Sequence, residues 1–146
     1  MELHKIENNK NAYMDILLLA DPDVEAIERY LYDGDLYIYN DGADTVGAAV
    51  LYPLEDGSCE LKNIAVLETL QGKGIGSKFL KKLMGEASKS YIHMLVGTTA
   101  PTEGFYKSLG FEYSHTIANF FIDNYPEPIF EDGVQCMDMR CFKVKL

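Results

Sequence analysis

A glycine-rich segment, Gln71-Gly72-Lys73-Gly74-Ile75-Gly76, is the part of this sequence that points most directly to chemistry. It follows a strand-like run from Leu61 to Leu67 and precedes a helical pattern that begins at Ile75. Glycine adopts backbone conformations closed to other residues, so several N–H groups can converge on one small anion where a helix starts. The segment therefore predicts a phosphate-binding loop, and a tight turn at the helix start is the alternative that uses the same glycines.

Apolar residues at helical spacing follow the loop and predict a helix over 75–87. They are Ile75, Phe79, Leu80, Leu83 and Met84. This apolar face would anchor the loop against a core, which favours a binding site over a linker. The segment from Thr69 to Gly85 contains lysines and no acidic residue. Lys73 and Lys78 are near enough to the loop to contact a phosphate, and a solvated helix face is the alternative explanation for these lysines.

Two common phosphate-binding motifs do not fit this segment. A nucleotide P-loop has Gly, four residues, then Gly-Lys-Ser/Thr, whereas here Lys73 lies between the first two glycines and Ser77 directly follows Gly76. The dinucleotide-binding motif is G-x-G-x-x-G, whereas this chain has G-x-G-x-G. Both motifs are therefore disfavoured.

The spacing Q-x-x-G-x-G, formed by Gln71, Gly74 and Gly76, resembles the acetyl-CoA loop of the GNAT superfamily of N-acetyltransferases. A second segment, Phe105-Tyr106-Lys107-Ser108-Leu109-Gly110-Phe111, resembles that family's late helix and the strand after it. The close resemblance covers residues 58–113. It implies acetyl-CoA as cosubstrate, an amine of a small molecule or a peptide as acceptor, and no metal. It also implies that the strand before the loop splays from the strand after it, so that the thioester arm enters the gap.

The resemblance assigns roles to individual residues of this chain. Those implied to bind the coenzyme are Ile64, Ala65, Val66, Gln71, Gly72, Lys73, Gly74, Ile75, Gly76 and Ser77. Tyr106 matches the family's general acid, and a core tyrosine on the short helix is the alternative. Glu60 matches the position where some members carry a general base, and a solvent-facing glutamate at a strand end is the alternative. Many relatives hold the pantetheine arm with an asparagine in or before the late helix. Residues 98–103 contain no asparagine, so Thr98 or Thr99 would have to substitute.

Acetyl transfer to an amine calls for a base, a hydrogen-bond donor for the oxyanion and an acid. An amine with a pKa of about 10.4 is neutral in only about one molecule per thousand at pH 7, so a base must help. The negative charge that develops on the thioester oxygen needs a preplaced donor, implied to be a backbone N–H near Val66. The departing thiolate needs a proton, which a phenol can supply. Because no Ser/His/Asp or metal constellation is present, we expect direct transfer without an acetyl-enzyme.

The predicted elements that position these residues alternate between strands and helices over one domain, residues 1–146. We expect a strand over 3–7, helices around 13–17 and 22–31, a hairpin over 36–52 and a strand over 59–67. Asp21 is the expected N-cap of the second helix, with Pro22 at its first position. Strands over 91–97, 111–122 and 136–144 follow, with a short helix opened by Pro101. The expected fold is a mixed α/β structure with a mostly antiparallel sheet flanked by helices.

Composition limits the partners and the compartment. The 146 residues carry a formal net charge of −10 and 47% hydrophobic residues, which suits one core-forming domain and disfavours general nucleic-acid binding. Cys59, Cys136 and Cys141 are odd in number and form no C-x-x-C pair, so a reducing cytoplasm is expected. No apolar run approaches about 18 residues, so no membrane association is expected.

The identity of the acceptor amine does not follow from the sequence. Acidic residues around the last loop could attract a cationic amine, and a group of tyrosines could line its pocket, although solvated loop charges and a half-buried surface are alternatives. The acidic residues are Asp123, Glu127, Glu131 and Asp132, and the tyrosines are Tyr30, Tyr32, Tyr37 and Tyr39. A catalytically silent acetyl-CoA-binding module is the alternative function. An exposed final strand could pair with a second copy to form a homodimer.

Overall fold

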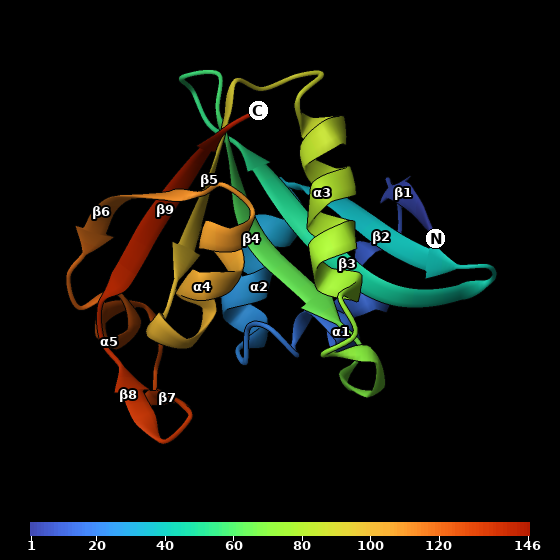
Figure 1. Cartoon of the computed structure of the whole chain (residues 1–146). Coiled ribbons are helices and arrows are strands. Elements are labelled where there is room, and N and C mark those ends of the chain that lie inside the picture. Colours follow the sequence, from blue (N-terminus) through green and yellow to red (C-terminus); the bar gives the residue numbers. More distant parts are fainter.

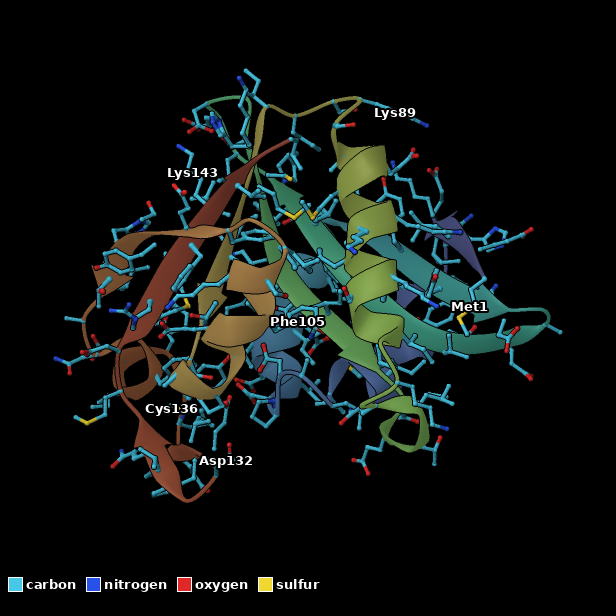
Figure 2. The ribbon with its side chains drawn as sticks, in the orientation of Figure 1. Met1, Lys89, Phe105, Asp132, Cys136 and Lys143 are labelled. Carbon is cyan, nitrogen blue, oxygen red and sulfur yellow. The ribbon has the colours of Figure 1, made fainter.

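Seven strands form one sheet in the computed structural model, which describes residues 1–146 (Figure 1). In sheet order they are β1 (Glu2–Ile6), β2 (Asp35–Asp41), β3 (Asp44–Pro53), β4 (Cys59–Val66), β5 (His93–Thr98), β9 (Met139–Lys145) and β6 (Glu112–Ile117). Neighbours are antiparallel except for β4 and β5, which are parallel. Two short strands, β7 (Ile129–Glu131) and β8 (Val134–Cys136), form a separate hairpin whose tip carries Asp132 (Figure 2).

Helices cover both faces of the sheet because apolar side chains point to both of its faces. One core contains Leu17, Ile27 and Leu31 of α1 (Met14–Leu17) and α2 (Val24–Leu31), packed on β2 and β3. The other core contains Phe79, Leu80 and Leu83 of α3 (Ile75–Ala87) and Tyr106 of α4 (Ala100–Ser108). Figure 1 shows α3 and α4 in front of the sheet and α2 behind it. The remaining helical segments are η1 (Lys10–Tyr13), η2 (Glu68–Leu70) and α5 (Phe120–Asn124).

Strands β4 and β5 separate part-way along their length. They pair only at Cys59 with Met94, Glu60 with Leu95 and Leu61 with Val96. Beyond Leu61 the two strands diverge, as the green and gold arrows in Figure 1 show. Residues 62–66 of β4 therefore have a sheet partner on one side only. This is the gap that the resemblance implied.

A β-bulge at Lys62 changes which face of the sheet the side chains of β4 occupy. Val50 pairs with Asn63 and Leu51 pairs with Leu61, so Lys62 has no partner on β3. Bulges of this kind re-aim the side chains that follow them. Leu61 accordingly lies in the core beneath α3, whereas Asn63 is opposite Val50 on the α1 and α2 face. Glu60 is opposite Tyr52, which also packs on that face, so Glu60 and Asn63 share it.

The predicted mixed α/β fold and the helix over 75–87 are confirmed, and three local predictions are wrong. The N-cap of α2 is Asp23, whose carboxylate accepts from the Ala26 N–H at 3.3 Å, because the carboxylate of Asp21 is engaged by tyrosine hydroxyls. The strand expected over 111–122 ends at Ile117. Asn119 then takes a left-handed conformation (φ 56) and α5 begins at Phe120.

The third wrong prediction concerns the final strand. It is not an exposed edge, because β9 lies between β5 and β6 and pairs with both. The edge strands of the sheet are β1 and β6. The final strand therefore has no free edge for the homodimer contact that was expected of it.

Candidate active site

The glycine loop has the backbone geometry of an anion site. Gly72 and Gly74 both have φ +78, a left-handed conformation that favours glycine, and a Cβ at either position would meet no atom within 4 Å. Gly74 is the N-cap of α3 and offers no side-chain cap. The N–H of Lys78 donates to the Gly74 carbonyl at 3.2 Å. The N–H groups of Ile75, Gly76 and Ser77 come before Lys78 in the first turn of α3 and have no intrahelical acceptor. They are therefore free to bind a ligand.

The loop is tied to the end of β4 by Gln71. Its side-chain amide donates to the Val66 carbonyl at 3.0 Å. Gly76 approaches the same strand from α3, since a Cβ on it would lie 3.9 Å from the Val66 side chain and 3.8 Å from Phe105. Figure 2 shows Phe105 on α4, on the side toward α3. Gln71 therefore orders the loop, a role that the Q-x-x-G-x-G spacing alone does not reveal.

Two backbone N–H groups of β4 face the gap. The Leu67 N–H donates to the Val46 carbonyl at 3.0 Å, and Val66 is opposite Gly47. In an antiparallel ladder this places Val66 in a non-hydrogen-bonded pair, whose N–H and C=O point away from β3. The N–H of Ile64, two residues earlier, points the same way as that of Val66, whereas the N–H of Ala65 points to β3. Ile64 and Val66 thus present N–H groups where β5 has diverged.

A cavity of about 770 Å³ lies where β4 and β5 separate. Glu60, Ile64, Thr98 and Tyr106 are among its lining residues, so the two predicted catalytic residues meet at one cavity. Residues 71–77 do not line it. They follow β4 beyond Val66, and residues 71–74 are exposed. The arrangement therefore has an exposed anion site after β4 and a deeper cavity at the gap.

Tyr106 lies on α4 between two aromatic rings. Its ring makes edge contacts with Phe105 and Phe111, at centroid distances of 5.1 Å and 5.5 Å. The residue is 8% exposed, and its hydroxyl makes no hydrogen bond with another protein group. Burial raises the pKa of the Tyr106 phenol to about 12, so the group is protonated at neutral pH. It can donate a proton and has no competing partner.

Glu60 lies half-buried on β4 beside a lysine. Its Oε2 is 3.1 Å from the Lys62 Nζ, and that ammonium also lies 5.9 Å from the centroid of the Tyr52 ring. All three residues line the cavity. A carboxylate at this position can accept a proton from a bound amine directly or through water.

Sequence reasoning missed a polar group in the cavity wall. Its members are Asp21, Tyr30, Asn63 and Tyr125, and all four line the cavity. The hydroxyls of Tyr30 and Tyr125 each donate to the Asp21 carboxylate at 3.0 Å, and the Asn63 Nδ2 donates to the Tyr30 hydroxyl at 3.1 Å. Burial raises the pKa of Asp21 and of both phenols. The sequence signals were an asparagine inside an apolar strand and Tyr30, one of the tyrosines expected to line an amine pocket.

The other predicted contacts divide between the cavity and the rest of the molecule. Thr98 and Thr99 line the cavity, but their hydroxyls donate to the Arg140 carbonyl and to Glu131, at 3.0 Å and 2.6 Å. Of the four acidic loop residues only Glu131 lines the cavity, and of the four tyrosines only Tyr30 does. Tyr37 and Tyr39 belong to the core beneath α3. Lys73 and Lys78 are exposed beside the loop.

The cysteines, the possible metal ligands and the helix lengths bear on the remaining sequence predictions. The three cysteines are buried free thiols. No group of three or more histidine, cysteine, aspartate or glutamate side chains is placed to hold a metal ion. None of the helices has the length and apolar character that a membrane span requires.

A family model described as "Acetyltransferase (GNAT) domain" matches residues 32–113. The chain is also 35% identical over 137 residues to an uncharacterized N-acetyltransferase, YvbK, of Bacillus subtilis, covering 91% of this chain and 88% of that protein. The chain belongs to the GNAT acetyltransferase family.

Solved structures of GNAT proteins resemble the whole chain. One is a GNAT family acetyltransferase from Elizabethkingia anophelis with acetyl-CoA bound, 38% identical with a TM-score of 0.93, covering 99% of this chain and 97% of that one. Another is an acetyltransferase from Bacillus subtilis in complex with CoA, 32% identical with a TM-score of 0.90, covering 99% and 98%. The GNAT fold therefore extends over the segments that flank the two motifs.

Proposed function

We propose that this GNAT protein transfers an acetyl group from acetyl-CoA to a primary amine by direct attack within a ternary complex. The observation that carries the proposal is that Tyr106 and Glu60, which are distant in sequence, line one cavity where β4 and β5 separate. The bound acetyl-CoA and CoA in two similar structures support the choice of cosubstrate.

The backbone around the loop would bind the coenzyme. The free N–H groups of Ile75, Gly76 and Ser77 suit a pyrophosphate, because they combine the unpaired donors of a helix start with its positive dipole. Gly72 and Gly74 allow the loop its left-handed turns, and Lys73 supplies positive charge from the exposed side. The N–H groups of Ile64 and Val66 would take the pantetheine arm and the thioester carbonyl in the gap, with Gln71 holding the loop against β4.

The residues then divide the reaction among them. Glu60 accepts a proton from the ammonium of the acceptor, directly or through water, and leaves a neutral amine. The amine nitrogen attacks the thioester carbonyl, and the Val66 N–H stabilises the resulting oxyanion. The C–S bond breaks as the carbonyl re-forms, and Tyr106 gives its proton to the departing thiolate. The products are an N-acetyl amide and free CoA. Tyr106 regains its proton from the acceptor nitrogen by way of solvent, and Glu60 releases its proton to solvent.

The direct test is a screen of amine acceptors with acetyl-CoA that follows the release of free thiol. Small-molecule amines and peptides with free amines belong in the same screen. The proposal expects amine-dependent thiol release that disappears when the acetyl-CoA is omitted. A protein that binds acetyl-CoA and releases no thiol with any amine would instead be a catalytically silent binding module. The buried free thiols are compatible with the expected cytoplasmic location, which stays a prediction.

A further inference from the structure

Asn63 presents an unpaired acceptor in the cavity wall. The residue is 4% exposed, and its Oδ1 is the one buried side-chain nitrogen or oxygen in the chain with no hydrogen-bond partner. A buried carbonyl oxygen without a donor is unfavourable, and exceptions to this rule call for an explanation. Since Asn63 lines the cavity, a donor on a bound ligand can supply the missing partner.

The orientation of the Asn63 amide is fixed by its neighbours. Its Nδ2 donates to the Leu17 carbonyl at 3.0 Å and to the Tyr30 hydroxyl at 3.1 Å. A carbonyl oxygen only accepts hydrogen bonds, so the atom facing Leu17 must be the nitrogen. Both Nδ2 hydrogens are therefore used inside the protein, and Oδ1 is left to accept from elsewhere.

A buried carboxylate increases the strength of this acceptor. Asp21 is 9% exposed, and both its oxygens are occupied, one by Tyr30 and one by Tyr125. Its charge polarises the Tyr30 hydroxyl and, through it, the Asn63 amide. Hydrogen bonds in such a chain reinforce one another. Oδ1 thus carries more negative charge than an isolated amide oxygen.

The surroundings of this group favour a cationic donor over a neutral one. Three carboxylates line the cavity, those of Asp21, Glu60 and Glu131, against two cations. Of the cations, Lys62 is paired with Glu60 at 3.1 Å, and Arg29 is exposed. Aromatic rings attract cations, and four aromatic residues line the cavity near this group or opposite it: Tyr30, Phe120, Phe121 and Tyr125.

We propose that Asp21, Tyr30, Asn63 and Tyr125 form a binding site for a second, protonated nitrogen of the acceptor, with Asn63 Oδ1 as the atom that accepts its hydrogen bond. The inference rests on the proposed function, because the first nitrogen is the one acetylated beside Glu60 and Tyr106. Glu60 and Asn63 share a face of β4, and their β3 partners Tyr52 and Val50 are two residues apart because of the bulge. The two positions are therefore separated by roughly 7 Å along the strand. The acceptor class is therefore a short aliphatic diamine.

The test is calorimetric binding to the complex with CoA, which does not depend on turnover. Four ligands of equal chain length differ only at one end: putrescine, butylamine, aminobutanol and γ-aminobutyrate. We expect putrescine to bind at least about tenfold more tightly than each of the others. Asn63→Leu should reduce the preference for putrescine over butylamine to within about twofold and leave CoA affinity unchanged.

Two further variants test the same site if Asn63→Leu fails to fold. Tyr30→Phe retains the ring but removes the link between Asp21 and Asn63, so it should also weaken the preference. Tyr52→Phe changes a phenol elsewhere in the cavity wall and should retain it. Undetectable putrescine binding, equal binding of butylamine or aminobutanol, or tighter binding of γ-aminobutyrate at Arg29 would each overturn the proposal. Tight putrescine binding without any thiol release would refute acetyl transfer and leave the second-nitrogen site standing.

Discussion

Replacement of Tyr106 by phenylalanine removes the proposed acid and almost nothing else. The Tyr106 hydroxyl makes no hydrogen bond with another protein group, and its ring packs between Phe105 and Phe111 through contacts that phenylalanine retains. We therefore expect the free energy of unfolding to change by less than about 0.5 kcal/mol. The glycine loop lies on another element, so the affinity for acetyl-CoA should stay near that of the wild type.

The expected loss of activity follows from the proton that Tyr106 is proposed to supply. Without a donor the thiolate must leave unprotonated or take its proton from water, and loss of a general acid typically costs about 10²-fold to 10⁴-fold. A 10²-fold loss corresponds to about 2.7 kcal/mol of transition-state stabilisation. Because the phenol with its pKa of about 12 is a weak acid, we expect a value at the lower end of this range. The loss should appear in kcat, since binding of the coenzyme is retained.

The assay is thiol release under saturating acetyl-CoA, with calorimetry to measure coenzyme affinity in parallel. Tyr32→Phe is the matched control, because Tyr32 is 52% exposed and lies outside the cavity. It should have the activity of the wild type. A Tyr106→Phe variant with wild-type kcat and unchanged coenzyme affinity would refute the assignment of Tyr106 as the acid.

Three further changes test other parts of the structure. Glu60→Gln should lower kcat/KM by about 10-fold or more while acetyl-CoA affinity is retained, and an unchanged rate would rule out Glu60 as the base. Gly74→Ala forces a Cβ at φ +78 and should weaken acetyl-CoA binding by about tenfold in a calorimetric titration, which equal affinities would contradict. Lys10→Met should lower the free energy of unfolding by about 1–3 kcal/mol, because its ammonium donates to the carbonyls of Leu31, Tyr32 and Gly34 after α2. Lys82→Met is its control in the same denaturation experiment, since the exposed bond of Lys82 to the Met1 carbonyl should contribute little, and equal losses in the two variants would argue against the role given to Lys10.

Local sequence patterns were sufficient for the loop and the helix that follows it. Glycines at positions with positive φ and an apolar stripe at helical spacing act within a few residues of each other, so Gly72, Gly74 and the helix over 75–87 were predictable. The short helix opened by Pro101 was predictable in the same way, whereas the role of Tyr106 came from the family resemblance and stays a prediction. The loop and these helices could be predicted without knowing which distant segments pack against them.

The features that escaped prediction depend on contacts between distant segments. The bulge at Lys62 arises from the register of β3 against β4, and it alone puts Glu60 and Asn63 on one face. Asp21 was the predicted N-cap because Pro22 suits the first position of a helix, and Asp23 caps α2 instead because tyrosine hydroxyls engage the carboxylate of Asp21. The segment after Ile117 has the apolar composition of a strand, but the backbone turns at Asn119.

The most direct test of coenzyme binding by the backbone N–H groups of the loop and of β4 is an amide NMR titration of the protein with acetyl-CoA. We expect saturable shifts concentrated at the N–H groups that the protein leaves unpaired, which are those of Ile64, Val66, Ile75, Gly76 and Ser77. The amide of Ala65, which faces β3, should shift less than its two neighbours. Shifts absent from these positions at saturating acetyl-CoA, or confined to another part of the molecule, would contradict coenzyme binding at the loop and the gap.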